Sequence, residues 1–351
     1  MQAAVMRGGE LVIDDLEDPT PGPGQLLVRT LACGICGSDL HALKHGDQLT
    51  AMSHETAAAV PDSPMVPEIM DLSHDVVMGH EFSAEVIEVG ENVGNCAEGD
   101  VVVSMPIVLD ERGIHPVGYS NRYAGGYAEL MVLSDLLALK VPNGLDARRA
   151  ALTEPMAVGL HAVNKSRIQP TMSAVVLGCG PVGLAVIAAL RLQGIDQIVA
   201  ADLSVRRRAL ATTMGADVVV DPRDRPAVEA WRSNGGNGPL VIFEAVGVPG
   251  MIDDAMRAAP RDAHIVVVGV CMVPDTIRPM RGISRELSMQ FALGYDPLEF
   301  ADTLRHIAEG EIDVSPLITG SVDVAGVPAA FIDLADPELH AKILVEPHLR
   351  A

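Results

Sequence analysis

The sequence predicts an α/β protein with a β-rich N-terminal part and a doubly wound, parallel sheet that carries helices on both faces. Three observations lead to this fold class. Short β-branched runs separated by turns fill roughly the first 141 residues, strands and helices alternate between residues 173 and 270, and a glycine-rich turn opens that alternation. A chain of 351 residues is long enough for two domains.

The balance of charge limits the partners of the chain. Acidic residues number 47 against 25 basic ones, which gives a net charge of −22. A nucleic-acid groove or an anionic membrane surface would need a basic stripe, so we expect neither partner. An anionic cofactor is still compatible, because backbone N–H groups at the start of a helix hold phosphate without net positive charge.

The cysteines and the apolar segments indicate a cytoplasmic protein. The segment Met1–Asp15 has no apolar core of the kind found in a secretory signal. Ala174–Leu190 is uncharged, but it is short for a membrane span and is interrupted near its start by three glycines and a proline. Five cysteines are too few and odd in number for a disulfide scaffold, so any special cysteine is expected to be a ligand or a nucleophile.

The N-terminal part predicts a small barrel or sandwich. Turn signals at residues 21–24 (Pro-Gly-Pro-Gly) and 98–100 (Glu-Gly-Asp) separate its strand-like runs. The stretch His45–Asp75, with three prolines, is expected to be a long loop or insertion. The strands are expected at Gln25–Arg29, Ala84–Val89, Val101–Ser104 and Tyr127–Val132.

The middle of the chain alternates between strand and helix signals, which predicts βαβ units and a parallel sheet. The last part is expected to hold a helix at Leu298–Glu309 and a final strand at Ala341–Val345. The expected strands of the sheet are Ser173–Leu177, Gln197–Ala201, Val218–Val220, Leu240–Glu244 and His264–Val270, and the helices are Pro181–Gln193, Val205–Met214, Arg225–Arg232 and Gly250–Ala259.

The motif Gly178-Cys-Gly180-Pro-Val-Gly183 is the strongest local signal. It directly follows an apolar strand and opens a helix, and Asp202 follows the next strand, 24 residues after Gly178 (202 − 178). Such glycines allow a tight turn and a close approach of a pyrophosphate to the helix N-terminus, while the acidic residue accepts hydrogen bonds from a ribose. The motif predicts a dinucleotide site, and a bare βα turn is the alternative.

Three further motifs are weak when each is taken alone. The pair Cys33 and Cys36 could be a redox dithiol or half of a zinc ribbon, but the other cysteines are isolated, which disfavours both. The run Gly-His80-Glu81-Phe could be a polar turn. A glutamate such as Glu154, at a helix start and before a proline, could simply favour the helix dipole.

Taken together and in this order, upstream of a dinucleotide fold, the motifs resemble the medium-chain, zinc-dependent alcohol dehydrogenase family over essentially the whole chain. The run Gly-Gly-Tyr-Ala-Glu at 125–129 adds to the resemblance, and Glu-Pro-Met-Ala-Val at 154–158 is most similar to the sorbitol and threonine dehydrogenase branch. The resemblance implies a GroES-like catalytic domain (1–154), an NAD-binding Rossmann domain (155–295) and a return to the catalytic domain (296–351).

The resemblance also implies a role for individual residues. Cys36 and His80 match zinc ligands, Glu81 and Glu154 match carboxylates that bind zinc directly or through water, and Asp39 matches the carboxylate that orients the histidine. Separately, the spacing after Cys36 predicts that Ser38 and His41 form a proton path out of the site, because Ser38 lies two residues after the ligand and His41 lies one helical turn further on; a surface histidine with no role is the alternative. Lys342 matches a basic residue near the pyrophosphate. The residues implied for cofactor binding are Gly178, Gly180, Pro181, Val182, Gly183, Asp202, Arg207, Val246, Gly269, Val270 and Lys342.

Two features of this chain depart from the family pattern. Asn95–Arg122 offers only Cys96, so the four-cysteine structural zinc of the family cannot form and we expect one catalytic zinc per chain. Cys36 and His80 lie 44 residues apart (80 − 36), a longer spacing than we expect, and the excess falls in His45–Asp75. Substrate-pocket residues are expected from His45–Asp75, Tyr119–Tyr123 and Phe291–Tyr295.

The predicted function is zinc- and NAD-dependent oxidation of a secondary alcohol or polyol, a small-molecule substrate, by hydride transfer. A zinc-free reductase of the same superfamily and a non-catalytic nucleotide-binding protein are the alternatives. NAD is expected over NADP because Asp202 occupies the place of a 2′-phosphate. A homodimer or homotetramer is expected, joined through the edge strand of the cofactor sheet at His264–Val270 and the residues directly after it.

Overall fold

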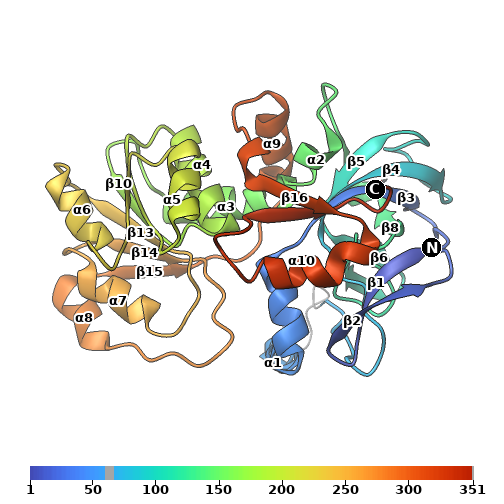
Figure 1. Cartoon of the computed structure of the whole chain (residues 1–351), viewed down its shortest axis with the longest axis horizontal. Coiled ribbons are helices and arrows are strands. Elements are labelled where there is room, and N and C mark those ends of the chain that lie inside the picture. The colour runs from blue at the N-terminus through green and yellow to red at the C-terminus, as the bar shows by residue number, and fades with distance from the viewer. Residues whose placement is uncertain (60–66, 350–351) are drawn as a thin grey trace.

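The computed structural model describes residues 1–59 and 67–349. Two parts lie side by side along the long axis of the molecule (Figure 1). One part is built on a six-stranded parallel sheet, and the other on a seven-stranded sheet that is mostly antiparallel. The α/β fold class predicted from the sequence is therefore confirmed.

The parallel sheet has the strand order β12-β11-β10-β13-β14-β15. The order reverses between β10 and β13, and such a reversal places a ligand crevice at the carboxyl ends of these strands. Its elements are β10 (Ser173–Leu177), α4 (Pro181–Leu192), β11 (Gln197–Ala201), α5 (Val205–Thr213), β12 (Val218–Val220), α6 (Ala227–Ser233), β13 (Leu240–Glu244), α7 (Met251–Ala258), β14 (His264–Val267), α8 (Pro279–Arg285) and β15 (Ser288–Phe291).

The edge of this sheet differs from the expectation. The strand expected at the edge, β14, is internal and pairs with both β13 and β15, so β15 is the edge strand. The burial pattern gives the reason. Ile265 and Val266 of β14 are fully buried, as a central strand requires, whereas β15 has no fully buried residue.

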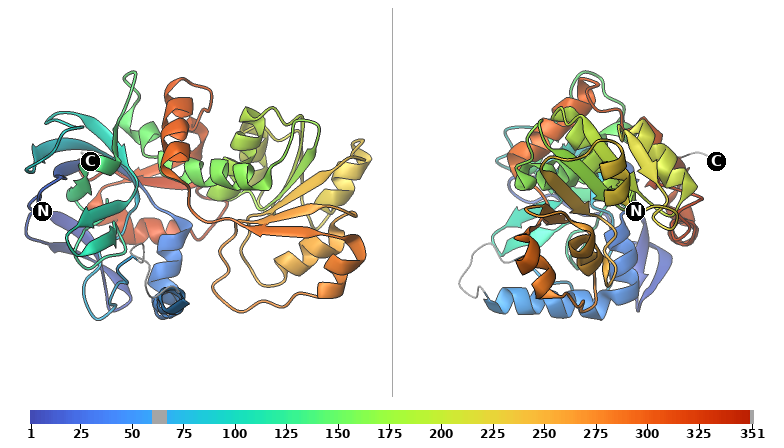
Figure 2. Two further views of the ribbon diagram at one scale, coloured as in Figure 1. Left: turned by 180° about the vertical axis from the view of Figure 1, so that it is seen from behind. Right: turned by 90° about the vertical axis from the view of Figure 1, so that its left-hand side faces the viewer.

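The β-rich part is built around the long strand β3, which pairs with β4, β8 and β17. The last two strands of the chain therefore return to the sheet of the first part (Figure 2). The strands are β1 (Gln2–Arg7), β2 (Glu10–Asp15), β3 (Gln25–Gly34), β4 (Glu81–Val89), β5 (Val101–Ser104), β6 (Ile107–Asp110), β7 (Gly113–Pro116), β8 (Leu130–Ser134), β9 (Ala138–Lys140), β16 (Ile318–Val322) and β17 (Lys342–Val345).

Helix α3 (Thr153–Ser166) joins the two parts, because it packs against both α4 and α9 (Pro297–Ala308). A polar contact fastens α3 to α9, since the Nδ1 of His161 lies 2.6 Å from a carboxylate oxygen of Glu299. Besides α1, the other helices within the described residues are α2 (Ala147–Ala150) and α10 (Val327–Asp333), with 3₁₀ turns at η1 (Asp135–Leu137), η2 (Ser315–Leu317) and η3 (Val324–Gly326).

The prediction of a long loop at His45–Asp75 is wrong for the first half of this segment, because α1 runs from Gly37 to Ala59 with a kink at His45. Figure 2 shows that the two halves of α1 point in different directions. All three prolines of the segment follow residue 59, so none interrupts the helix. Residues 60–66 of the expected insertion lie outside the described residues.

Among the helices that the structure describes, none is both long enough and apolar enough to cross a membrane.

Candidate active site

The end of β3 and the start of β4 bring three candidate metal ligands together. Cys36 lies between β3 and α1, while His80 directly precedes β4 and Glu81 begins it. The strands are antiparallel and pair Gly34 with Glu81, so the two ends meet. The Cys36 thiol, a His80 ring nitrogen and a Glu81 carboxylate oxygen lie within 4.8 Å of one another. The fold thus joins residues that are more than 40 positions apart in the sequence.

Gly34 is needed for the approach of Glu81. A Cβ atom at this position would overlap the Glu81 carboxylate. The absence of a side chain at Gly34 leaves room for a fully buried carboxylate beside the other two ligands.

Asp39 lies directly beside the His80 ring. Its carboxylate is fully buried, and its Oδ1 lies 3.3 Å from the His80 Nδ1. The Cys36 backbone N–H and the Tyr127 hydroxyl donate to its Oδ2 over 3.0 and 2.6 Å. Burial alone would raise the pKa of Asp39, but His80 and these hydrogen bonds lower it, so the carboxylate stays ionised.

The arrangement fits a zinc ion. The buried Nδ1 of His80 faces Asp39, so the Nε2 is directed to the cluster, with the Ser38 hydroxyl oxygen 3.5 Å away. A carboxylate behind a ligating imidazole is the common way to fix its orientation. Thiolate, imidazole and carboxylate are the donors of catalytic zinc sites. Cys33, by contrast, is fully buried, and burial raises the pKa of its thiol.

Glu154 lies at the start of α3, close to this cluster. Burial is the main reason that its pKa is raised to about 7, with a further contribution from the negative charge of Glu81. Tyr295 lies near Glu154, and burial together with the negative charge of Glu154 raises the pKa of its phenol. The mutually close set of three ligand atoms contains Glu81 and not Glu154, so direct metal binding by Glu154 stays a prediction.

Lys342 is bonded to Glu81. Its ammonium group lies 2.7 and 2.6 Å from the two carboxylate oxygens and donates to the Ile35 carbonyl over 3.1 Å. The sequence analysis places Lys342 near the pyrophosphate. In the structure its three N–H donors instead face Glu81 and the Ile35 carbonyl, because the buried Glu81 carboxylate requires a counter-charge. Lys342 and Pro181 line the same small cavity, so the lysine lies between the metal ligands and the glycine-rich turn.

The glycine-rich turn has the geometry expected of a pyrophosphate site. Gly178 has φ +89°, and a Cβ at Gly183 would overlap the Gly178 carbonyl. Pro181, Val182 and Gly183 form the first turn of α4, after the N-cap Gly180. The Asp202 carboxylate, at the end of β11, accepts the backbone N–H groups of Cys179 and Ser204, each over 2.8 Å. The Arg207 guanidinium lies beside Gly180.

The other predicted cofactor residues lie at the same edge of the sheet. Val246 follows β13, and Gly269 and Val270 follow β14. The backbone at Gly247 closely approaches that of Val270. Glu244, which the sequence analysis did not single out, is buried and accepts the N–H groups of Val246 and Gly247 over 2.8 and 3.0 Å. It fixes the loop next to the crevice.

Ser38 and His41 lie in the first turns of α1, so the segment after Cys36 is helical, as the proposed proton path requires. The ring of His41 is partly buried and its centroid lies 6.3 Å from that of His45. The transfer of a proton through these two residues stays a prediction.

Comparisons with known proteins identify the family. The family model described as an alcohol dehydrogenase GroES-like domain matches residues 22–143, and the zinc-binding dehydrogenase model matches residues 181–309. The (R,R)-butanediol dehydrogenase of Bacillus subtilis is 32% identical over 97% of this chain and 97% of that enzyme. The chain belongs to the medium-chain, zinc-dependent alcohol dehydrogenase family.

Solved structures agree over the full length of this dehydrogenase. The crystal structure of 2R,3R-butanediol dehydrogenase from Bacillus subtilis has a TM-score of 0.83 and 31% identity, and covers 99% of each chain. A zinc-binding dehydrogenase from Sinorhizobium meliloti, bound to NADP, has a TM-score of 0.83, 26% identity and the same coverage. The sorbitol dehydrogenase of Bacillus subtilis is 28% identical over 77% of this chain and 75% of that enzyme.

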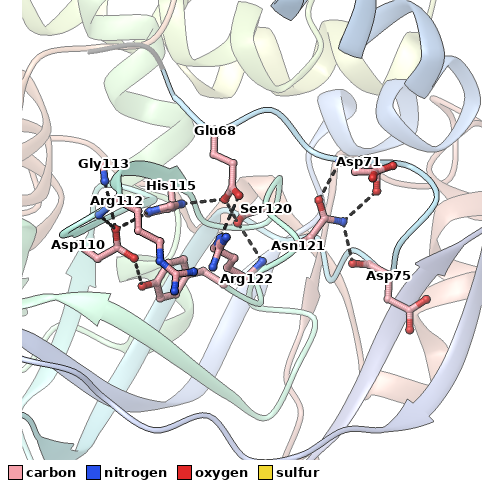
Figure 3. Close-up of polar contacts among 11 residues, drawn as sticks. Glu68, Asp71, Asp75, Asp110, Arg112, Gly113, His115, Ser120, Asn121 and Arg122 are labelled. Carbon is pink, nitrogen blue, oxygen red and sulfur yellow. Dashed lines mark hydrogen bonds and ion pairs between the residues drawn. The ribbon is translucent and has the colours of Figure 1, made fainter. Parts of the chain in front are cut away.

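In this alcohol dehydrogenase, a polar network holds residues 107–123, which we call the lobe. The lobe contains β6 and β7, and buried His115 lies at its centre (Figure 3). The His115 Nδ1 lies 2.8 Å from Glu68, and the Nε2 lies 2.7 Å from Asp110. Ser120 donates to Glu68 over 3.0 Å, and Arg122 pairs with the same carboxylate over 3.1 Å.

Two tyrosines of the expected pocket segments reach the dehydrogenase site. Tyr119, from the lobe, lies 3.0 Å from the Ser38 hydroxyl oxygen and donates to Asp39 over 2.8 Å. Tyr295 lies near Glu154, at the start of α3. The sequence analysis named their segments but gave neither residue a role, because no local pattern connects a tyrosine to a side chain 80 positions away.

Proposed function

We propose that this dehydrogenase oxidises a secondary alcohol, with a vicinal diol such as 2,3-butanediol as the preferred class, and reduces NAD in the same reaction. The observation that carries this proposal is the cluster of Cys36, His80 and Glu81 next to a parallel-sheet crevice with a glycine-rich turn. The names of two relatives, a butanediol and a sorbitol dehydrogenase, support a substrate with neighbouring hydroxyl groups.

We propose one zinc per chain, held by Cys36 and His80 together with Glu81 or Glu154. When bound there, zinc supplies a Lewis acid that lowers the pKa of an alcohol. The polar network around His115 supports a single zinc, because it occupies the lobe with an imidazole and two carboxylates in place of four cysteines.

The protein residues orient the substrate and remove its proton. Asp39 keeps the His80 ring in place, and Ser38 lies on the ligand side of that ring, where its hydroxyl can accept the proton of the substrate hydroxyl. His41, one helical turn further along α1, passes that proton to solvent. Since burial and the nearby charges of His45 and Lys44 lower the pKa of His41, it gives up the proton readily at neutral pH.

We propose a preference for NAD over NADP. Asp202 is held at the turn by two backbone N–H groups. The 2′-phosphate of NADP would lie next to the negative charge of this carboxylate and would be repelled by it. Two such charges a few ångströms apart repel by about 1 kcal/mol in water and by several at lower effective dielectric. Arg207 lies beside Gly180 and is proposed to pack against the adenine.

The proposed assembly is a homodimer or homotetramer joined through β15. Phe291 and Leu293, at and just after this edge strand, are exposed apolar side chains, and α8 beside it has no buried residue.

The five free cysteines support a reducing cytoplasmic location. The pairing of β16 with β17, and of β17 with β3, supports the division into 1–154, 155–295 and a returning segment 296–351.

A substrate screen with NAD and NADP on zinc-loaded protein tests the proposal. We expect NADH formation with 2,3-butanediol stereoisomers above that with primary alcohols. Full activity in protein stripped of metal would favour the zinc-free reductase, and binding of NAD without oxidation of any alcohol would favour the non-catalytic protein.

A further inference from the structure

Tyr119 contacts active-site residues, although it belongs to none of the sequence motifs that identify the site. The two residues that follow it, Ser120 and Asn121, anchor its segment through hydrogen bonds (Figure 3). Ser120 donates to Glu68 over 3.0 Å, and the Asn121 side chain donates to the Asp71 carbonyl over 2.9 Å and accepts the Asp71 N–H over 2.7 Å. The lobe therefore fixes the backbone from which the Tyr119 phenol projects.

The hydrogen atoms around Tyr119 can be assigned by counting donors. A phenol has one hydrogen, and the Asp39 Oδ1, 2.8 Å away, accepts it. The hydrogen of Tyr119 is therefore committed to Asp39. The Ser38 and Tyr119 oxygens lie 3.0 Å apart, so the hydrogen between them must come from Ser38.

This assignment fixes the direction of the Ser38 hydroxyl, which could otherwise rotate freely about its Cβ–Oγ bond. With its hydrogen on Tyr119, its lone pairs are left for the ligand side, where the His80 Nε2 lies 3.5 Å away. A substrate hydroxyl that comes to this side meets an acceptor and not a competing donor.

We propose that Tyr119 is a positioning residue that holds the Ser38 hydroxyl as a hydrogen-bond acceptor for the substrate hydroxyl. The proposal rests on the alcohol oxidation proposed above. Tyr119 itself gains and loses no proton, because Ser38 passes the proton that it accepts on toward His41 and keeps the hydrogen that is bonded to Tyr119. The Tyr119 hydroxyl affects the rate of proton transfer through Ser38, and no metal ligand relies on Tyr119 alone for its position.

Support of the metal site is the competing role for Tyr119, because its phenol also contacts Asp39 and its ring lies 5.3 Å from the His80 ring. Asp39, however, keeps the Cys36 N–H, the Tyr127 hydroxyl and His80 when the Tyr119 hydroxyl is removed. A Tyr119→Phe variant also keeps the ring. We therefore expect its zinc affinity, measured by competition with a chelator, to change by less than about threefold.

The decisive experiment is a double-mutant cycle on the zinc-loaded protein with 2,3-butanediol and NAD. Tyr119→Phe should lower kcat about tenfold, the size expected for one lost hydrogen bond, and should leave KM within about twofold. Because Tyr119 acts through Ser38, the Ser38→Ala and Tyr119→Phe/Ser38→Ala proteins should have the same kcat within about twofold.

Tyr123→Phe is the matched control. It removes a phenol oxygen from the same lobe, bonded to Asp110 and Gln25 and not to Ser38. Its kcat should fall much less than that of Tyr119→Phe, which separates the position of Ser38 from the general integrity of the lobe.

Three results would overturn the inference: a wild-type kcat in Tyr119→Phe, losses that multiply in the double variant, or zinc affinity reduced about tenfold or more. The proposed function is judged by other proteins in the same set. If Ser38→Ala keeps wild-type activity, the proton path is wrong, and if the wild type oxidises no alcohol, the proposed function fails together with the inference that rests on it.

Discussion

Replacing His115 by glutamine should loosen the lobe without unfolding the rest of the protein. The substitution removes a positive charge held between Glu68 and Asp110 and leaves at most one of two charge-assisted hydrogen bonds. Such bonds contribute about 1.5–3 kcal/mol each. The carboxylates are 29% and 19% exposed and water would partly replace the ring, so we expect a loss of about 2–4 kcal/mol in local stability.

Hydrogen exchange of the backbone amides of β6 and β7 measures this loss directly. A change of 2–4 kcal/mol corresponds to exchange that is roughly 30- to 800-fold faster. His74→Gln is the matched control, because His74 also pairs with a carboxylate, that of Asp71 at 3.1 Å, but is largely exposed. Exposed pairs contribute at most about 1 kcal/mol, so this control should exchange nearly as the wild type does.

The pH dependence of the same amides gives a second test. Burial lowers the pKa of His115, but the two carboxylates outweigh it and raise the pKa above 6.5. The stabilisation is therefore complete below about pH 6.5 and is lost as the pH rises through the raised pKa. Glu68 and Asp110 have lowered pKa values, so their contribution is lost only in acid. Equal lobe protection in wild type and His115→Gln across this range would refute the reasoning.

Three further outcomes are expected. Cys36→Ser should bind zinc at least about tenfold more weakly by chelator competition while its thermal unfolding without metal matches that of the metal-free wild type, and wild-type zinc affinity would exclude Cys36 as a ligand. Asp202→Ser should raise kcat/KM for NADP relative to NAD about tenfold or more, and an unchanged ratio would remove Asp202 from cofactor choice. Leu293→Asp should lower the mass measured by light scattering to that of the monomer, because it places a charge on the exposed apolar surface beside β15. An unchanged mass would show that the assembly does not use this surface.

The cofactor sheet was predictable because its signals are local. Each β-branched run from Ser173 to Glu244 is a strand, and the glycine pattern lies at a turn whose backbone requires glycine, with φ +89° at Gly178. The missed elements have weaker local patterns. The strand Ser288–Phe291 is only four residues long, and α1 has little separation of polar and apolar faces, so helical periodicity does not reveal it.

The candidate ligands were named from a family resemblance, and the fold brings Cys36, His80 and Glu81 together. The contacts that surround them were not predictable. Lys342 is bonded to Glu81 across 261 residues, and Tyr119 to Asp39 across 80. Such pairs are set by which strands and loops the fold makes neighbours, and a single sequence contains no periodic signal for them.

Zinc titration of metal-free protein tests the central claim most directly. NADH formation from 2,3-butanediol would be followed as zinc is added back to protein stripped by a chelator. The account predicts no turnover without zinc, a linear rise, and a plateau at one zinc per chain, with no rise in Cys36→Ser. Turnover by the stripped protein, or a plateau reached only at two zincs per chain, would contradict it.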